Sequence, residues 1–395
     1  MKKIDIRLAG IIQGQEEIDA VMRVLKTDPP WHVSGSECNA LQDEIAKKFG
    51  VKYCVVVNSG SSANLLAMSS LNLPKHSTIL TSACGFPATL NPIIHLGYIP
   101  SLVDYDLKTL NISLDEIEES IRYSDIRAMI VAHTLGSSLD MDRLINIAKN
   151  KGVILIEDCC EAIGTKYDNK YVGSFGKIST ISFYSSHQIS GFGGGGALLT
   201  NDQNIYERAK SLRDWGKKSV REGYICTKMD TMVDGMPYDQ QYSYSTIGYN
   251  MRFPDGNCAY AREQLKRLDN FVNIRQRNYM QLDCALKMDV SDHLHFMQWP
   301  FKASPAFFGY PIVLKQDGLR DKMVSYLEDN GIHVRLFFAG NILKHDAYKN
   351  LYYVPYRHFP VADYLMKNAF FVGVWPGLTI EDMEYMSIKI KEFFQ

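Results

Sequence analysis

The feature that constrains this chain most is a regular alternation of short apolar runs with helix-forming stretches between residues 52 and 200. Predicted strands lie at residues 52–57, 78–82, 100–104, 128–133 and 153–158, and predicted helices at residues 63–70, 87–96, 114–121 and 141–149. The apolar runs are nearly continuous, which is typical of strands that are buried on both faces. Strands and helices that alternate in this way form a mostly parallel sheet between helices, so we expect an α/β fold.

Residues capable of chemistry follow several of these strands. They are Gly60, Phe86, His133, Asp158 and the turn at residues 185–187. In parallel sheets ligands bind beyond the carboxyl ends of the strands. We therefore expect these residues to surround one ligand site.

The first strand ends in Asn58-Ser59-Gly60-Ser61-Ser62, immediately before a helix. Free N–H groups in the first turn and the helix dipole favour an anion at such a place, and a phosphate is the usual one. Many similar turns bind nothing, so the pattern has only moderate specificity. Asp158 also has two interpretations, as the N-cap of a helix at residues 159–163 or as a counter-ion to a cationic group, and its position favours neither.

The segment from residue 178 to residue 201 contains a strand, a polar turn with His187, a run of glycines and a second strand. A histidine at the mouth of a buried strand can carry out proton chemistry, although such a residue is more often structural. Gly191, Gly193 and Gly196 also match the dinucleotide-binding fingerprint. That fingerprint requires a helix to follow, and residues 197–200 predict a strand, so we discount a dehydrogenase.

Beyond residue 216 the pattern changes. Residues 217–244 are polar and poor in strands, and two helices are expected at residues 258–268 and from there to about residue 286. Strands at 308–314 and 332–336 with helices at 319–330 and 380–394 then predict an α+β unit. We expect a large domain of residues 1–268 and a smaller C-terminal domain of residues 269–395.

Composition excludes several classes of protein. The net charge is −1 without a basic tract, so neither nucleic acid nor an anionic membrane is an expected partner. No apolar run reaches the roughly 18–20 residues of a membrane span, and no signal peptide is recognisable, so we expect a cytoplasmic protein. The eight cysteines show no C-x-x-C spacing, which argues against a disulfide framework or a metal site.

Five motifs together give the chain a family resemblance. They lie at residues 34–35, 58–61, 156–164, 172–176 and 247–250. From about Val33 to the C-terminus the chain resembles the DegT/StrS group of vitamin B6-dependent sugar-nucleotide aminotransferases. The resemblance implies a fold-type I pyridoxal phosphate (PLP) transferase with a smaller C-terminal α+β domain.

One position departs from the aminotransferases of that group. His187 occupies the place of the lysine that binds PLP covalently, and an imidazole has no primary amine with which to do so. The chain therefore resembles the dehydratase branch of the family, in which pyridoxamine phosphate (PMP) binds without a covalent link. By this resemblance His187 is the catalytic base.

The resemblance also implies roles for residues around the cofactor ring. Asp158 pairs with the pyridinium nitrogen and completes the catalytic set, which makes the ring an electron sink. Phe86 stacks on the ring, although it could be a core residue. Glu161 lies on the side of the 3-hydroxyl group, although it could simply cap a turn. His133 is expected to be structural.

Other residues are implied to hold the cofactor phosphate. Gly60, Ser61 and Ser182 form its cradle, and Asn250 reaches it from the neighbouring subunit. A homodimer with shared active sites follows from that last role.

The implied reaction is removal of the C3 hydroxyl group from a nucleotide-linked 4-keto-6-deoxyhexose, in deoxysugar biosynthesis of the O-antigen type, with L-glutamate as amino donor. One relative in this branch carries four cysteines for an iron–sulfur cluster after Arg-Asp-Trp-Gly. Here Arg213-Asp214-Trp215-Gly216 precedes a loop with Cys226 alone, and we expect no cluster. The alternatives are a catalytically inactive relative that binds vitamin B6 or a nucleotide sugar as a regulator, and a sugar aminotransferase with atypical cofactor anchoring.

Overall fold

A computed structural model describes residues 4–27, 32–219, 228–355 and 357–395. Within these residues the large domain is built on a seven-stranded sheet in the order β1-β11-β10-β7-β6-β2-β3. Its strands are β1 (Tyr53–Val57), β2 (Thr78–Ser82), β3 (Ile99–Val103), β6 (Ile126–Ala132), β7 (Ile154–Asp158), β10 (Ile178–Ser182) and β11 (Gly196–Thr200). Only β11 runs antiparallel to its neighbours. The expected mostly parallel sheet is thus confirmed.

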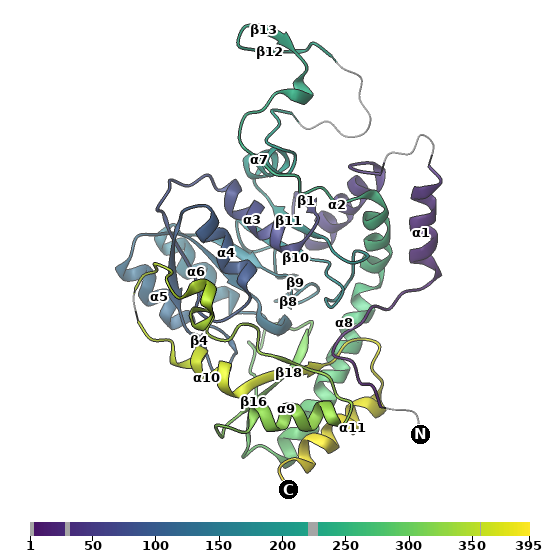
Figure 1. Cartoon of the computed structure of the whole chain (residues 1–395), viewed down its shortest axis with the longest axis vertical. Coiled ribbons are helices and arrows are strands. Elements are labelled where there is room, and N and C mark those ends of the chain that lie inside the picture. The colour runs from purple at the N-terminus through teal and green to yellow at the C-terminus, as the bar shows by residue number, and fades with distance from the viewer. Residues whose placement is uncertain (1–3, 28–31, 220–227, 356) are drawn as a thin grey trace.

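Helices pack around this sheet (Figure 1). They are α2 (Ser36–Phe49), α3 (Gly60–Ser70), α4 (Pro87–His95), α5 (Leu114–Tyr123), α6 (Met141–Lys151) and α7 (Gln203–Arg213). The strands of this sheet are largely buried, and β10 and β11 are buried at every position. This agrees with the continuous apolar runs of the sequence.

The C-terminal part contains a four-stranded sheet in the order β14-β16-β18-β17, which is antiparallel throughout. Its elements are β14 (Leu294–His295), β16 (Gly309–Leu314), β17 (Val334–Leu336), β18 (Ala369–Gly373), α9 (Arg320–Asp329), α10 (Pro360–Asn368) and α11 (Ile380–Glu392). Here the sequence prediction missed α10 and β18. The N-terminal segment joins this part through a bridge between Ile6 and Ile332.

A single helix, α8 (Asp255–Asp289), runs through both parts of the molecule (Figure 1). It packs against α1 (Gln15–Leu25) and α2 at one end and against α11 at the other. The two separate helices expected here were wrong, since no proline interrupts the segment and the helix is continuous. The expected boundary between residues 268 and 269 falls inside this helix, and the division into 1–268 and 269–395 stays a prediction.

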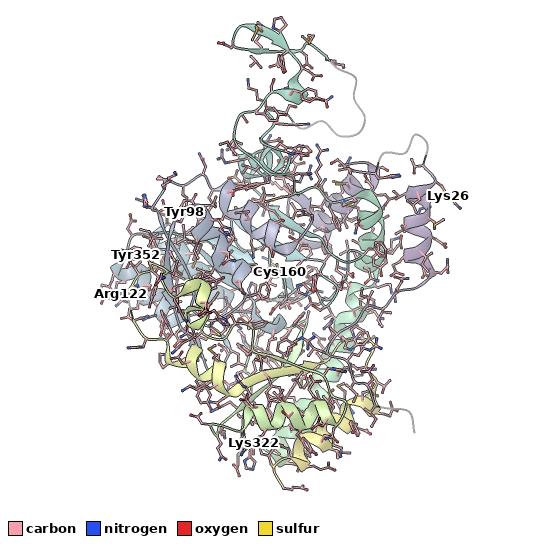
Figure 2. The ribbon with its side chains drawn as sticks, viewed as in Figure 1. Lys26, Tyr98, Arg122, Cys160, Lys322 and Tyr352 are labelled. Carbon is pink, nitrogen blue, oxygen red and sulfur yellow. The ribbon has the colours of Figure 1, made fainter. Side chains whose placement is uncertain are left out.

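A hairpin of β12 (Thr231–Val233) and β13 (Met236–Tyr238) projects from the large domain beyond α7 (Figure 1). Two further small sheets are present: a two-stranded sheet of β4 (Tyr105–Asp106) and β5 (Asn111–Ile112), and a three-stranded sheet of β15 (Ala303–Ser304), β8 (Lys166–Tyr167) and β9 (Lys170–Tyr171). No helix of the described ranges is both long and apolar enough to cross a bilayer. In Figure 2 Cys160 lies near the middle of the molecule, whereas Lys26, Arg122 and Lys322 lie at its periphery.

Candidate active site

A cavity of about 1430 Å³ opens at the carboxyl edge of the large sheet, where the C-terminal part faces it. Its walls come from the turns after β1, β2, β6, β7 and β10, and from the N-terminal segment and the end of β17. All of the strand-end residues singled out in the sequence line it, namely Gly60, Phe86, His133, Asp158, Ser185, Ser186 and His187. The structure therefore brings them to one place, as the topology predicted.

Asp158 ends β7 and is 6% exposed. Its Oδ2 accepts hydrogen bonds from the side chains of Asn64 and Thr89, both at 2.8 Å, and its Oδ1 accepts one from the backbone N–H of Cys160 at 3.1 Å. Asn64 is fixed in turn by Thr180, whose hydroxyl donates to it at 2.5 Å. Neutral donors hold the carboxylate, and in the described residues it has no ion pair. It is thus available to a cationic group in the cavity.

The helix expected at residues 159–163 is not formed, and the segment is a series of turns. Asp158 accordingly does not cap a helix. Its bond to the N–H of Cys160 is a local turn contact, and this removes one of the two interpretations that the sequence left open.

The start of α3 forms one end of the cavity. Ser59 caps the helix by accepting a hydrogen bond from the N–H of Ser62 at 3.0 Å, and Gly60 and Ser61 follow at the cavity wall. A Cβ atom on Gly60 would lie 2.7 Å from the Cβ of Ser182, so only glycine allows α3 to approach β10 this closely. The first N–H groups of a helix lack acceptors within the helix, and this end favours a phosphate.

His187 lies in a tight turn after β10. Its N–H donates to the carbonyl of Tyr184 at 2.9 Å, and its own carbonyl accepts a hydrogen bond from Arg275 Nη2 at 3.2 Å. The ring packs edge-on against Phe308, with 5.2 Å between ring centroids, and its Nδ1 is 3.5 Å from the hydroxyl oxygen of Ser186. Burial, with the charge of Arg275, lowers the pKa of His187 to about 3. The imidazole is therefore neutral near pH 7, with a free ring nitrogen lone pair, and is a weaker base than an ordinary histidine.

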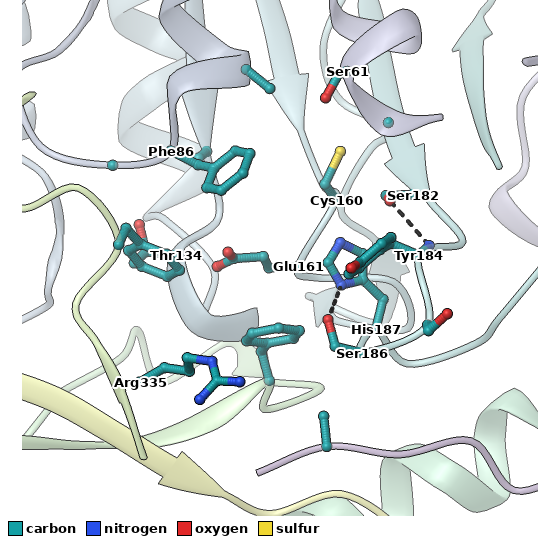
Figure 3. A pocket seen from close by; sticks show the side chains of 18 of the residues that line it. Ser61, Phe86, Thr134, Cys160, Glu161, Ser182, Tyr184, Ser186, His187 and Arg335 are labelled. Atoms are coloured by element: carbon teal, nitrogen blue, oxygen red, sulfur yellow. Dashed lines mark hydrogen bonds between the residues drawn. The ribbon is translucent and has the colours of Figure 1, made fainter. Parts of the chain in front are cut away.

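Glu161 lies beside it in the cavity (Figure 3). Its Oε2 accepts a hydrogen bond from the N–H of Leu135 at 3.0 Å. Burial, with the negative charge of Asp158 adding to it, raises the pKa of Glu161 to about 8. Near neutral pH this carboxyl group is protonated for most of the time and can donate a hydrogen bond.

Two of the expected cofactor residues differ in their surroundings. Phe86 precedes α4 and is 58% exposed, with its ring facing the cavity in Figure 3, so it is no core residue. Asn250 is exposed, forms a bridge with Asp214 and does not line the cavity of its own chain. Cys226 lies outside the described residues.

His133 is buried and is part of a structural cluster. Its Nε2 lies 3.2 Å from Glu157 Oε2, and the carboxylate of Glu157 also accepts hydrogen bonds from the N–H groups of Gly173, Phe175 and Gly176 at 2.6–2.9 Å. These donors occupy both carboxylate oxygens. The cluster thus anchors the loop at residues 172–176, as expected for a structural histidine, and Glu157 is its centre.

The family model for the DegT/DnrJ/EryC1/StrS aminotransferase family matches residues 12–391, nearly the whole chain. The chain belongs to this family. The resemblance drawn from the sequence motifs is thereby confirmed, as is the fold class.

Several members of the DegT/DnrJ/EryC1/StrS family are similar to this chain over most of their length. The lipopolysaccharide biosynthesis protein RfbH of Salmonella typhimurium is 35% identical, with 98% of this chain and 91% of that protein covered. The dTDP-4-dehydro-2,6-dideoxy-D-glucose 3-dehydratase of Saccharopolyspora spinosa is also 35% identical, with 91% and 80% covered. The E. coli GDP-4-keto-6-deoxy-D-mannose-3-dehydratase, solved with bound hydrated PLP, has a TM-score of 0.88 at 28% identity, with 98% and 100% covered.

Several residues that the sequence did not indicate hold the site residues in position. Asn64 and Thr89 hold Asp158, and Arg275 holds the backbone of His187. The N-terminal segment and Arg335 line the outer half of the cavity. Only Asn64 carried a signal, because it lies one turn into the helix that begins at Gly60.

Proposed function

We propose that this chain is a PMP/PLP-dependent sugar-nucleotide 3-dehydratase. It removes the C3 hydroxyl group of a nucleotide-linked 4-keto-6-deoxyhexose, and L-glutamate restores the amine form of the cofactor. One observation carries the proposal: no lysine is found among the described residues that line the cavity, and the neutral imidazole of His187 lies there instead. No lysine amine is therefore available there to bind the cofactor covalently.

The residues present fit a non-covalent vitamin B6 cofactor. The start of α3 at Gly60 and Ser61, with Ser182 beside it, suits the phosphate, and Asp158 suits the pyridinium nitrogen. When bound, the cofactor supplies an amine that condenses with the sugar ketone and a ring that takes up electrons. His187 accepts the proton that is released.

Similar proteins support the substrate class. Relatives of this length are named as 3-dehydratases of dTDP- and GDP-linked deoxysugars. A solved structure of the GDP-sugar enzyme holds a trapped PLP–glutamate geminal diamine, which supports glutamate as amino donor. Asn250, exposed and away from its own cavity, suits contact with a neighbouring subunit, and we include a homodimer in the proposal.

The test combines a cofactor assay with a substrate screen. Borohydride reduction of the PLP-loaded protein, then denaturation and mass spectrometry, should leave the polypeptide unmodified. With glutamate, one of the GDP-, CDP- or dTDP-linked 4-keto-6-deoxyhexoses should give a keto sugar that has lost the C3 oxygen. An amino sugar as the product would instead make the chain an aminotransferase. Stoichiometric iron in anaerobically purified protein would contradict the proposed absence of a cluster.

A further inference from the structure

A small chamber adjoins the large cavity at the turn that carries His187. Its volume is about 10 Å³, and its walls come from the turn at residues 185–190, the N-terminal segment at residues 10–12, α8 and Pro376. Ser185 and His187 line both spaces. A chamber of this volume admits one water molecule and no larger ligand.

Three buried side chains in the wall of this chamber each have one polar atom that no described residue pairs with. They are Gln188, Ser190 and Arg275, which are 2%, 3% and 1% exposed, and the atoms are Oε1, Oγ and Nε. An unpaired buried polar atom costs free energy, most of all on a charged guanidinium. Three such atoms around one chamber indicate that a small polar molecule binds between them.

The other polar atoms of Gln188 and Arg275 hold the backbone around the candidate base. Arg275 donates to the carbonyl of His187 and to two carbonyls of the segment 306–308, each at 3.2 Å. Gln188 Nε2 donates to the carbonyl of Glu161 and, at 2.8 Å, to a third carbonyl of the segment 306–308. The backbones of the base, of Glu161 and of the segment that packs on the base are thus tied together beside the chamber.

The same bonds indicate which molecule suits the chamber. Because two carbonyls fix the amide nitrogen of Gln188, its remaining polar atom, Oε1, can only accept a hydrogen bond. Arg275 Nε can only donate, whereas the hydroxyl of Ser190 can do either. Water both donates and accepts, but an anion would face the oxygen of Gln188. A water molecule therefore suits all three atoms.

We propose that one water molecule is bound between Gln188, Ser190 and Arg275 as a fixed part of the site, and that Ser190 acts through it as a positioning residue for His187. Gln188 and Arg275 hold the backbone on either side of the base, and the water joins these two side chains to each other and to the turn. The water site stands independently of the proposed function, whereas the positioning role rests on it.

The first experiment is a crystal structure of the PLP-loaded protein, with a second crystal soaked in bromide. One density peak should lie about 3 Å from each of Gln188 Oε1, Ser190 Oγ and Arg275 Nε, and it should show no anomalous signal from bromide. Direct pairing of the three side chains with one another would overturn the proposal, and so would a bromide peak in the chamber.

The second experiment compares Ser190→Ala with a matched control, Ser101→Ala, by urea unfolding of the holoenzyme. Ser101 is also buried with an unpaired hydroxyl group, but it lines neither the chamber nor the large cavity. Ser190→Ala breaks a hydrogen bond to the water and should raise the unfolding equilibrium constant by about twofold to tenfold. Ser101→Ala removes a hydroxyl group that makes no bond and should not raise it. Equal effects of the two substitutions would count against a water molecule at Ser190.

The positioning role has readouts of its own in Ser190→Ala. Hydrogen exchange at the amide of His187, which donates to the carbonyl of Tyr184, should become faster. The kcat for the sugar should fall by about twofold to tenfold with KM unchanged, because reactants bind in the large cavity and not in the chamber. A native exchange rate at His187, or an unchanged kcat, would show that Ser190 does not position the base. If no sugar loses its C3 oxygen, the proposed function fails, while the density and the exchange rate still decide the water site.

Discussion

Glu161 offers a quantitative test of the electrostatics of the cavity. The pKa of its carboxyl group rises from an ordinary 4.5 to about 8, chiefly through burial. The folded protein therefore binds a proton that the unfolded chain releases between these values, and stability falls as the pH rises through that range. Linkage gives a loss of about 1 kcal/mol by pH 5 and about 4 kcal/mol by pH 8.

Glu161→Gln keeps the size of the side chain and an oxygen for the N–H of Leu135, but it cannot ionise. Relative to the native protein, the variant should gain about 3 kcal/mol of stability between pH 5 and pH 8. Urea unfolding of the cofactor-free proteins at both pH values measures this difference. If the two proteins differ equally at pH 5 and pH 8, Glu161 is ionised throughout and the reasoning is wrong.

Three further substitutions test the site. His187→Asn should lower turnover by about 10²–10⁴-fold, the usual value of a general base, with unchanged cofactor content; turnover near the native rate would place the base elsewhere. Gly60→Ala puts a Cβ atom 2.7 Å from that of Ser182. It should displace the start of α3 and speed cofactor loss on dialysis, and an unchanged rate of loss would argue against a phosphate site there. Asn64→Leu removes a donor from Asp158 and an acceptor from Thr180, which should lower stability by about 1–3 kcal/mol in urea unfolding. A stability equal to that of the native protein would show that the two groups find other partners.

The residues at strand ends could be predicted because the local sequence alone marks them. Gly60, Phe86, Asp158 and His187 each follow an apolar run, and parallel topology alone brings such positions together. His187, which stands where related aminotransferases have the PLP-binding lysine, then indicated non-covalent cofactor binding.

The supporting residues could not be predicted in this way. Arg275 lies 88 residues beyond His187 and contacts only its backbone carbonyl, so nothing in the sequence pairs the two. Arg335 belongs to a different sheet and reaches the cavity only because the C-terminal part folds over it. Residues 258–286 were expected to form two helices, whereas α8 is continuous from Asp255 to Asp289, because no residue within it breaks a helix.

The 35 residues of α8 also set a limit on motion. Sharp kinks in helices arise at proline, at glycine pairs or at local bulges, and from residue 257 to residue 289 this helix contains no proline or glycine. Swinging the C-terminal part as a rigid body about this axis would require breaking backbone hydrogen bonds in the helix. The continuous helix therefore opposes a hinge between the large domain and the C-terminal part, which together form the walls of the cavity.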